Sequence, residues 1–216
     1  MEAGIAQSSG WSVRQFVEAA ISIFAIVNPI GNLPLFASLT EGLTSASRRS
    51  LFRLATLTAL AVIAVMALAG QFLVETFFQL TLDQFAFAGG LVLVVVGTRR
   101  MVVEQYTQRP PLADDDARVR LAVSPIALPL LVGPGSIVNV MLIAHQQDRV
   151  FAVLACLAAF VGVFAVLRFS DWLYRLMGRI GTLAVGRVMQ IFIVAMGVKF
   201  CFRALENMVH QWGIAK

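Results

Sequence analysis

Long runs without a charged residue constrain the fold of this chain more than any other feature. Four runs cover residues 19–40, 54–74, 121–147 and 150–167, and two shorter runs cover 84–98 and 188–198. About 20 apolar residues cross a bilayer as a helix. With 59% hydrophobic and 13% charged residues, the chain has too little polar surface to coat a water-soluble fold of 216 residues. The sequence therefore predicts an all-α integral membrane protein.

Six transmembrane helices are expected from these runs. We place them at about residues 14–39, 51–76, 82–103, 120–144, 149–171 and 183–208. Helical periods and glycine-rich packing faces favour helices over the weak alternation that is typical of a transmembrane barrel. The first residues lack a basic segment ahead of a short apolar core, so we expect the first helix to stay in the membrane rather than be cleaved.

The basic residues predict an orientation, because they are retained on the cytoplasmic side. Of the 17 Lys and Arg residues, twelve fall in or beside the first, third and fifth loops, and five fall on the opposite side. The twelve are Arg48, Arg49, Arg53, Arg99, Arg100, Arg109, Arg118, Arg120, Arg168, Arg175, Arg179 and Arg187, and the five are Arg14, Arg149, Lys199, Arg203 and Lys216. Both termini are therefore expected outside the cytoplasm. The positive charge indicates topology, and no nucleic-acid partner is expected.

The two halves of the chain are similar to each other on either side of a polar linker, residues 104–119. NPIGNLPLF at 28–36 resembles SPIALPLL at 124–131, and Gly90 and Gly97 match Gln190 and Gly197 in spacing. We therefore expect a first three-helix repeat at 1–103 and a second at 120–216 within one membrane domain. Because three crossings are an odd number, the second repeat enters the membrane inverted. The aspartates at 114–116 are interpreted as a solvated run or a helix cap rather than a cation site.

Five of the seven prolines lie in the first and fourth expected helices, which we therefore predict to be discontinuous. A proline donates no backbone hydrogen bond, and in a membrane the freed groups must be buried in protein or line a polar cavity. The expected helix-breaking residues are Pro29, Pro34, Pro125, Pro129 and Pro134, and the expected polar contacts are Asn28, Gly31, Asn32, Ser124, Gly133, Gly135 and Ser136. The alternative is that single prolines only kink their helices.

Two breaks near the middle of the membrane offer complementary chemistry. Half-helix amino termini suit a carboxylate, whereas unwound carbonyls and half-helix carboxyl termini suit an ammonium group or Na⁺. That pair of preferences fits a zwitterion. Asn139 could add a further polar group, and Gln190 is left open between facing the pathway and packing.

The sequence offers little that indicates an enzyme or a metal site. No Walker A loop, HExxH sequence or Gly-x-Ser-x-Gly turn is present. Ser136 follows Gly135 in a way that suggests a nucleophile only superficially, because no His or Lys is expected at its depth. Cys156 and Cys201 are interpreted as small apolar packing residues. We therefore expect no catalytic residues, no metal and no cofactor.

The two proline-containing motifs, in the first and fourth expected helices, resemble those of the MarC family. This family is also called the neutral amino acid transporter family of six-helix bacterial inner-membrane proteins. The resemblance rests on Asn28-Pro29-x-Gly31-Asn32-x-Pro34-x-Phe36 and on the segment from Ser124 to Ser136, and it covers residues 12 to 210. It implies two inverted three-helix repeats whose broken helices hold small neutral amino acids such as glycine and alanine. Coupling to H⁺ or Na⁺ is suggested for relatives, and the sequence does not decide it.

The leading hypothesis is a secondary transporter that works by alternating access around a site between the first and fourth helices. The alternatives are a passive channel in which the same carbonyls form a filter, and a membrane protein related to stress or antibiotic resistance that carries no flux. The expected partners are a small neutral amino acid and the lipid bilayer, with a homo-oligomer left open. The sequence does not identify the preferred amino acid or the direction of transport.

Overall fold

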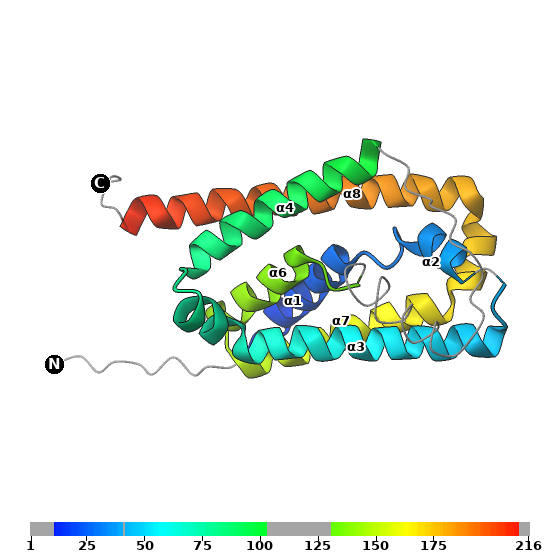
Figure 1. Cartoon of the computed structure of the whole chain (residues 1–216), viewed down its shortest axis with the longest axis horizontal. Coiled ribbons are helices and arrows are strands. Elements are labelled where there is room, and N and C mark those ends of the chain that lie inside the picture. Colours follow the sequence, from blue (N-terminus) through cyan, green and yellow to red (C-terminus); the bar gives the residue numbers. More distant parts are fainter. Residues whose placement is uncertain (1–10, 41, 103–130, 212–216) are drawn as a thin grey trace.

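The computed structural model describes residues 11–40, 42–102 and 131–211, and every regular element in these ranges is a helix (Figure 1). The elements are α1 (Val13–Val27), α2 (Leu33–Leu39), α3 (Ser45–Phe72), the π-helical turn η1 (Leu73–Phe77), α4 (Leu82–Val102), α6 (Pro134–Gln146), α7 (Arg149–Arg168) and α8 (Ser170–Gln211). Four segments within these ranges are long and apolar enough to cross a membrane: Ser45–Phe77, Leu82–Val102, Arg149–Arg168 and Ile180–Gln211. The fold is that of an all-helical membrane protein, and the expected linker at 104–119 lies outside the described residues.

Capping side chains explain where several helices begin. Thr44 Oγ1 accepts a hydrogen bond of 3.2 Å from the Ser47 backbone N–H at the start of α3. At the start of α7, Asp148 Oδ1 accepts one of 2.7 Å from the Phe151 N–H, and its Oδ2 accepts one of 2.8 Å from Trp11 Nε1. The bond from Phe151 is the main reason that the pKa of the Asp148 carboxyl lies below its ordinary value. These caps satisfy N–H groups that a helix leaves unpaired in its first turn.

The last helix differs from its expected range of 183–208. Helix α8 begins at Ser170 and turns a corner at Gly178, whose φ of 63° and ψ of −178° are not helical. Glycine adopts a positive φ without steric cost, so it suits this corner. The segment before the corner mixes charged and apolar residues, which is why no membrane span was expected there, and Asp171 in it forms an ion pair with Arg48 of α3.

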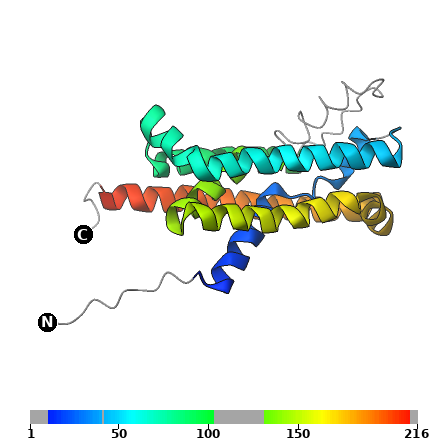
Figure 2. The same ribbon diagram turned by 90° about the horizontal axis from the view of Figure 1, so that it is seen from below.

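Two pairs of long helices frame the bundle, with the shorter helices between them (Figure 1). Helix α4 packs along α8, and α3 packs along α7, while α1 and α6 lie between these pairs. Figure 2 shows α1 sloping away from the long helices toward its amino end. The carboxyl end of α1 and the described helix α6 therefore lie between the two pairs of long helices.

The α4–α8 pair is held by a close backbone approach. A Cβ atom on Gly90 would lie 2.6 Å from the carbonyl oxygen of Gly197, and one on Gly197 would lie 2.7 Å from that of Gly90. Toward the far end of the pair, Asn207 Nδ2 donates a hydrogen bond of 2.8 Å to Asp83 Oδ1. The two helices therefore run antiparallel, and small residues let their backbones touch, as in other membrane helix pairs.

Gly90→Ala should destabilise the protein, because the added methyl group meets backbone atoms that cannot rotate away. We expect the free energy of unfolding to fall by about 1–3 kcal/mol, the usual cost of overpacking. Thermal or denaturant unfolding of the purified protein in detergent measures the change. Ala88→Leu, on the exposed face of the same helix, is the control and should change stability by less than about 0.5 kcal/mol. Equal stability of Gly90→Ala and the wild type would contradict the backbone contact.

Candidate functional site

The first expected helix is interrupted between Val27 and Leu33. Asn28 ends α1 in the left-handed conformation, with φ 50° and ψ 55°, and its N–H donates to the Phe24 carbonyl at 2.9 Å. Asparagine is one of the few residues other than glycine that adopts this conformation. Pro29 follows and disfavours the helical conformation in the residue before it. The break therefore comes from the Asn-Pro pair, and Pro34 lies in the first turn of α2, where a proline is tolerated.

Side chains of the break repair most of its backbone. Asn28 Oδ1 accepts a hydrogen bond of 3.0 Å from the Gly31 N–H, and the Asn28 carbonyl accepts one of 3.2 Å from the Asn32 N–H. Asn32 Nδ2 donates to the Val27 carbonyl at 3.4 Å. Both asparagines are buried, Asn28 to the point that only 2% of it is exposed. The amide groups thus replace the helical hydrogen bonds that the turn removes.

Gly31 is required by the position of the Asn28 amide. A Cβ atom on Gly31 would lie 2.6 Å from Asn28 Oδ1 and closer still to Nδ2. No side chain fits there unless Asn28 moves. Gly31 therefore acts by making room for the amide, rather than through its own conformational freedom.

The fourth expected helix is described only from Leu131, where α6 begins after Gly133 with Pro134 as its first residue. Ser136 is buried, and its Oγ donates a hydrogen bond of 2.8 Å to the Gly133 carbonyl. Gly135 lies against the Leu93 side chain of α4. No side chain caps this helix start, and no acidic residue lies in its first turn. The amino end of α6 is thus an uncapped helix terminus at which Gly135 and Ser136 are buried and Pro134 is exposed. Ser124, Pro125 and Pro129 lie outside the described residues.

One hydrogen bond sets the two breaks at a similar level. Asn139 Nδ2 of α6 donates to Ser22 Oγ of α1 at 3.0 Å, and Ser22 Oγ donates in turn to the Ala19 carbonyl at 2.9 Å. Asn28 lies six residues after Ser22, and Gly133 lies six residues before Asn139. At the helical rise, each break is about 9 Å along its helix from this bond. The carboxyl end of α1 and the amino end of α6 therefore point toward the same end of the bundle (Figure 1).

Helices α4 and α8 add residues to the break that sequence reasoning did not assign to it. Arg100 donates from a terminal guanidinium nitrogen to Asn32 Oδ1 at 3.3 Å. Gly186 packs against Gly31, because a Cβ atom on Gly186 would lie 3.3 Å from the Gly31 carbonyl oxygen. No local motif marks either residue. Only the packing of α4 and α8 against the break reveals them.

The chemistry of this region is polar and almost uncharged. Asn28, Asn32, Ser136 and Asn139 are all buried, and amides and hydroxyls offer both donors and acceptors. The carboxyl end of α1 carries a partial negative charge, and the amino end of α6 carries a partial positive charge. Neighbouring half-helix ends of opposite sign can bind the two ends of one dipolar molecule.

Comparison with known proteins gives a consistent family. The sequence profile described as "MarC family integral membrane protein" matches residues 13–209. The chain is 32% identical over 205 residues to a UPF0056 membrane protein of Archaeoglobus fulgidus, covering 89% of this chain and 92% of that one. It is 28% identical over 197 residues to the UPF0056 membrane protein YhcE of Escherichia coli K12, covering 87% and 90%.

A third relative is the UPF0056 inner membrane protein YhgN of Escherichia coli K12, which is 28% identical over 189 residues, covering 87% of this chain and 94% of that one. No solved structure matches the chain.

A double-mutant cycle should detect the bond that aligns the two breaks. We expect Ser22→Ala and Asn139→Ala each to destabilise the protein, and their coupling energy to be about 0.5–1.5 kcal/mol, as for hydrogen bonds between membrane helices. Unfolding in detergent of the wild type, both single variants and the double variant gives this energy. Ser22→Ala combined with Asn207→Ala is the control pair and should be additive. Additivity of the Ser22 and Asn139 substitutions would argue against the bond.

Proposed function

This chain belongs to the MarC family of integral membrane proteins, and on that premise we propose that it is a secondary transporter of small neutral amino acids such as glycine and alanine. The observation that carries the proposal is the buried carboxyl end of α1 near the uncapped amino end of α6, where Gly135 and Ser136 are buried. An α-amino acid is a zwitterion whose carboxylate and ammonium groups match these two ends. The site would consist of Asn28, Gly31 and Asn32 on the first broken helix and Gly133, Gly135 and Ser136 on the fourth.

The polar side chains of this site support a substrate without net charge. Asn28, Asn32 and Ser136 are neutral, and the Arg100 guanidinium contacts Asn32 from α4. Ser136 donates its hydroxyl hydrogen to the Gly133 carbonyl, which supports a role at the helix start rather than as an enzyme nucleophile. Amide and backbone groups bind a zwitterion without burying a fixed charge when the site is empty, which would be costly in a membrane.

We propose that two inverted three-helix repeats, residues 1–103 and 120–216, move relative to each other in alternating access. An inverted two-fold axis would exchange α2 with α6, α3 with α7 and α4 with α8. It would leave the α3–α7 and α4–α8 contacts unchanged, and it would exchange the α2–α8 contact with the α6–α4 contact. All four contacts are present among the described helices, which supports this exchange.

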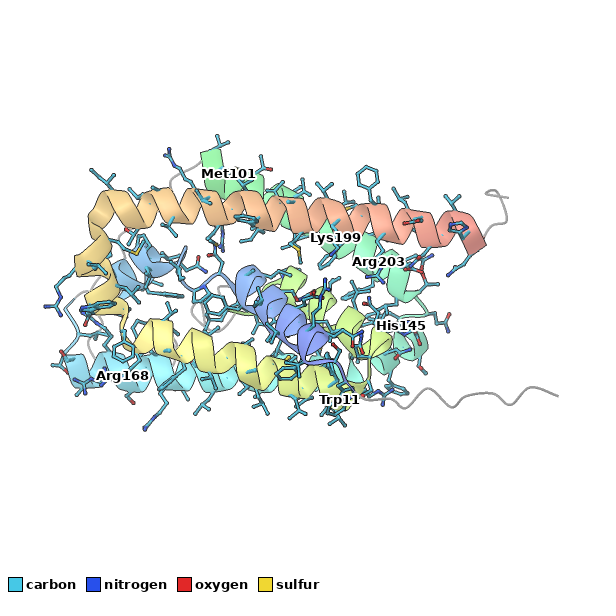
Figure 3. All side chains as sticks on the ribbon, turned by 180° about the vertical axis from the view of Figure 1, so that it is seen from behind. Trp11, Met101, His145, Arg168, Lys199 and Arg203 are labelled. Atoms are coloured by element: carbon cyan, nitrogen blue, oxygen red, sulfur yellow. The ribbon has the colours of Figure 1, made fainter. Side chains whose placement is uncertain are left out.

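The distribution of basic residues supports an inner-membrane location with both termini in the periplasm. Met101 and Arg168 lie toward one end of the bundle, whereas Trp11, His145 and Arg203 lie toward the other (Figure 3). The first end includes Arg48, Arg49 and Arg53 of α3, Arg99 and Arg100 of α4, Arg168 of α7 and Arg175 in the first segment of α8. Under the positive-inside rule this end faces the cytoplasm. The name of the relative YhgN includes the inner membrane, which agrees with this placement.

Transport of alanine by purified protein in liposomes tests the function. Vesicles preloaded with unlabelled alanine should accumulate labelled alanine in a saturable way, because an alternating-access site exchanges substrate across the membrane. Asn32→Ala should reduce the rate at least about tenfold, the effect of losing about 1.4 kcal/mol of interaction. Asn207→Ala, at the far end of α8, is the control and should transport at the wild-type rate.

The same vesicles separate the transporter from its alternatives. Unitary currents without saturation would favour a passive channel over the proposed mechanism. Wild-type vesicles that exchange neither glycine nor alanine faster than empty vesicles, under any ion gradient, would refute amino acid transport.

A further inference from the structure

Two buried amide atoms near the break have no hydrogen-bond partner among the described residues. They are Asn28 Nδ2 on the first broken helix and Gln190 Oε1 on α8. Only 2% of Asn28 and 6% of Gln190 is exposed. A third such atom, Arg48 Nε, belongs to a guanidinium that already bonds Asp171 and the Thr40 carbonyl. The two amides therefore stand out as polar groups with unused hydrogen-bonding capacity.

The contact of Gly186 with Gly31 places both amides near the break that follows α1. The Gly31 backbone lies against Gly186 of α8, and the Asn28 amide lies where a side chain on Gly31 would be. Gln190 follows Gly186 by four residues, so the two share one face of α8, with Cβ positions about 6 Å apart. Both are buried in the bundle. Asn28 therefore contacts Gly31 directly, and Gln190 lies one helical turn along α8 from the residue that packs against Gly31.

The unpaired atoms differ in kind. The Asn28 oxygen already accepts from the Gly31 N–H at 3.0 Å, which fixes the orientation of its amide and leaves two N–H hydrogens free to donate. The Gln190 oxygen is free to accept. A buried polar atom without a partner lowers stability, so proteins satisfy nearly all of them. A free donor and a free acceptor therefore lie near the proposed binding site. The carboxylate of an amino acid can accept from the donor, and its ammonium group can donate to the acceptor.

We propose that Gln190 is a substrate-binding residue of this site. Its Oε1 accepts a hydrogen bond from the ammonium group of the amino acid, which the carboxyl end of α1 also attracts. Asn28 Nδ2 donates to the carboxylate, which the amino end of α6 also attracts. This assignment rests on the proposed function and deepens it, because it names which side chain recognises which end of the substrate. It also brings the last helix into the site, so that substrate bridges α8 and the first broken helix.

The alternative is a structural role, in which Gln190 joins two helices by a hydrogen bond, as polar residues in membrane helices often do. That role needs a partner on a neighbouring helix, and none is present for Oε1 within the described residues. A resident water could fill the same position. Water and substrate make different predictions, because only a substrate bond depends on the ammonium group of the ligand.

Binding of labelled alanine to purified protein in detergent tests the assignment directly. Gln190→Leu has nearly the same size and removes the acceptor, so the half-saturating alanine concentration should rise about tenfold or more, as expected when a charged group loses a hydrogen bond. Gln211→Leu, the same change at the end of α8, is the matched control and should bind as the wild type does. Thermal unfolding of each variant establishes that it is folded.

Ligands that lack one end of the substrate identify the partner of each amide. Lactate has a hydroxyl group in place of the ammonium group, and ethylamine has no carboxylate. Gln190→Leu should weaken competition by ethylamine and leave competition by lactate unchanged. Asn28→Asp should weaken competition by lactate and should not weaken competition by ethylamine. It keeps the acceptor for the Gly31 N–H, tolerates the left-handed conformation, loses the donor and adds a negative charge. Gln190→Glu keeps an acceptor and should bind ethylamine at least as tightly as the wild type, which covers the case in which Gln190→Leu does not fold.

The outcomes separate the two proposals. Wild-type protein that binds and exchanges alanine while Gln190→Leu binds it equally well would overturn the role of Gln190 and leave the transporter standing. Equal weakening of lactate and ethylamine in Gln190→Leu would indicate a structural role and would also overturn the assignment. Wild-type protein that neither binds nor exchanges alanine would overturn both.

Discussion

A backbone group in the hydrocarbon of a bilayer has no water to bond, so each N–H and C=O must find its partner within the protein. This constraint explains why the interruption between α1 and α2 is surrounded by amide side chains. Asn28 accepts from the Gly31 N–H, and Asn32 donates to the Val27 carbonyl. A helix can be opened here because the sequence supplies substitutes for the lost hydrogen bonds. The same substitution places polar groups where the rest of the bundle is apolar.

The long helices stabilise the interruption of the first helix by packing around it. Glycines let α4 and α8 approach until the backbones of Gly90 and Gly197 touch, and α3 packs along α7 on the other side of the bundle. Because the broken segments lie between these pairs, their stability depends on the frame more than on helix propensity, which is weak for a seven-residue helix such as α2. Movement of the long helices would therefore change the conformation of the broken segments first.

The sequence predicted the elements that depend on local chemistry. Asparagine, proline and glycine at 28–31 mark a helix break by their backbone preferences alone, and the helix α6 start after Gly133 follows from the same rules. It did not predict contacts between distant elements. Arg100 was interpreted only as a basic residue near the cytoplasm, and Gly186 was not assigned to the break. Their places beside Asn32 and Gly31 depend on how α4 and α8 cross. The helical segment before Gly178 was missed because its charges resemble those of a loop.

The polar residues of the bundle divide into those that hold it together and those that remain open. The side-chain N–H groups of Asn32 and Asn139 donate hydrogen bonds to the Val27 carbonyl and to Ser22 Oγ. Each bond fixes the geometry of a break. Within the part of the chain that the structure describes, Asn28 and Gln190 each keep one buried atom without a hydrogen-bond partner. In the proposed transporter this division has a kinetic consequence. Neutral amides and helix ends recognise both ends of a zwitterion without forming an ion pair with a charged side chain. Release of a substrate from such a buried ion pair would leave an uncompensated charge, which is costly in free energy. A site of this kind can specify the shape of an amino acid and still let it leave, which alternating access requires in every cycle.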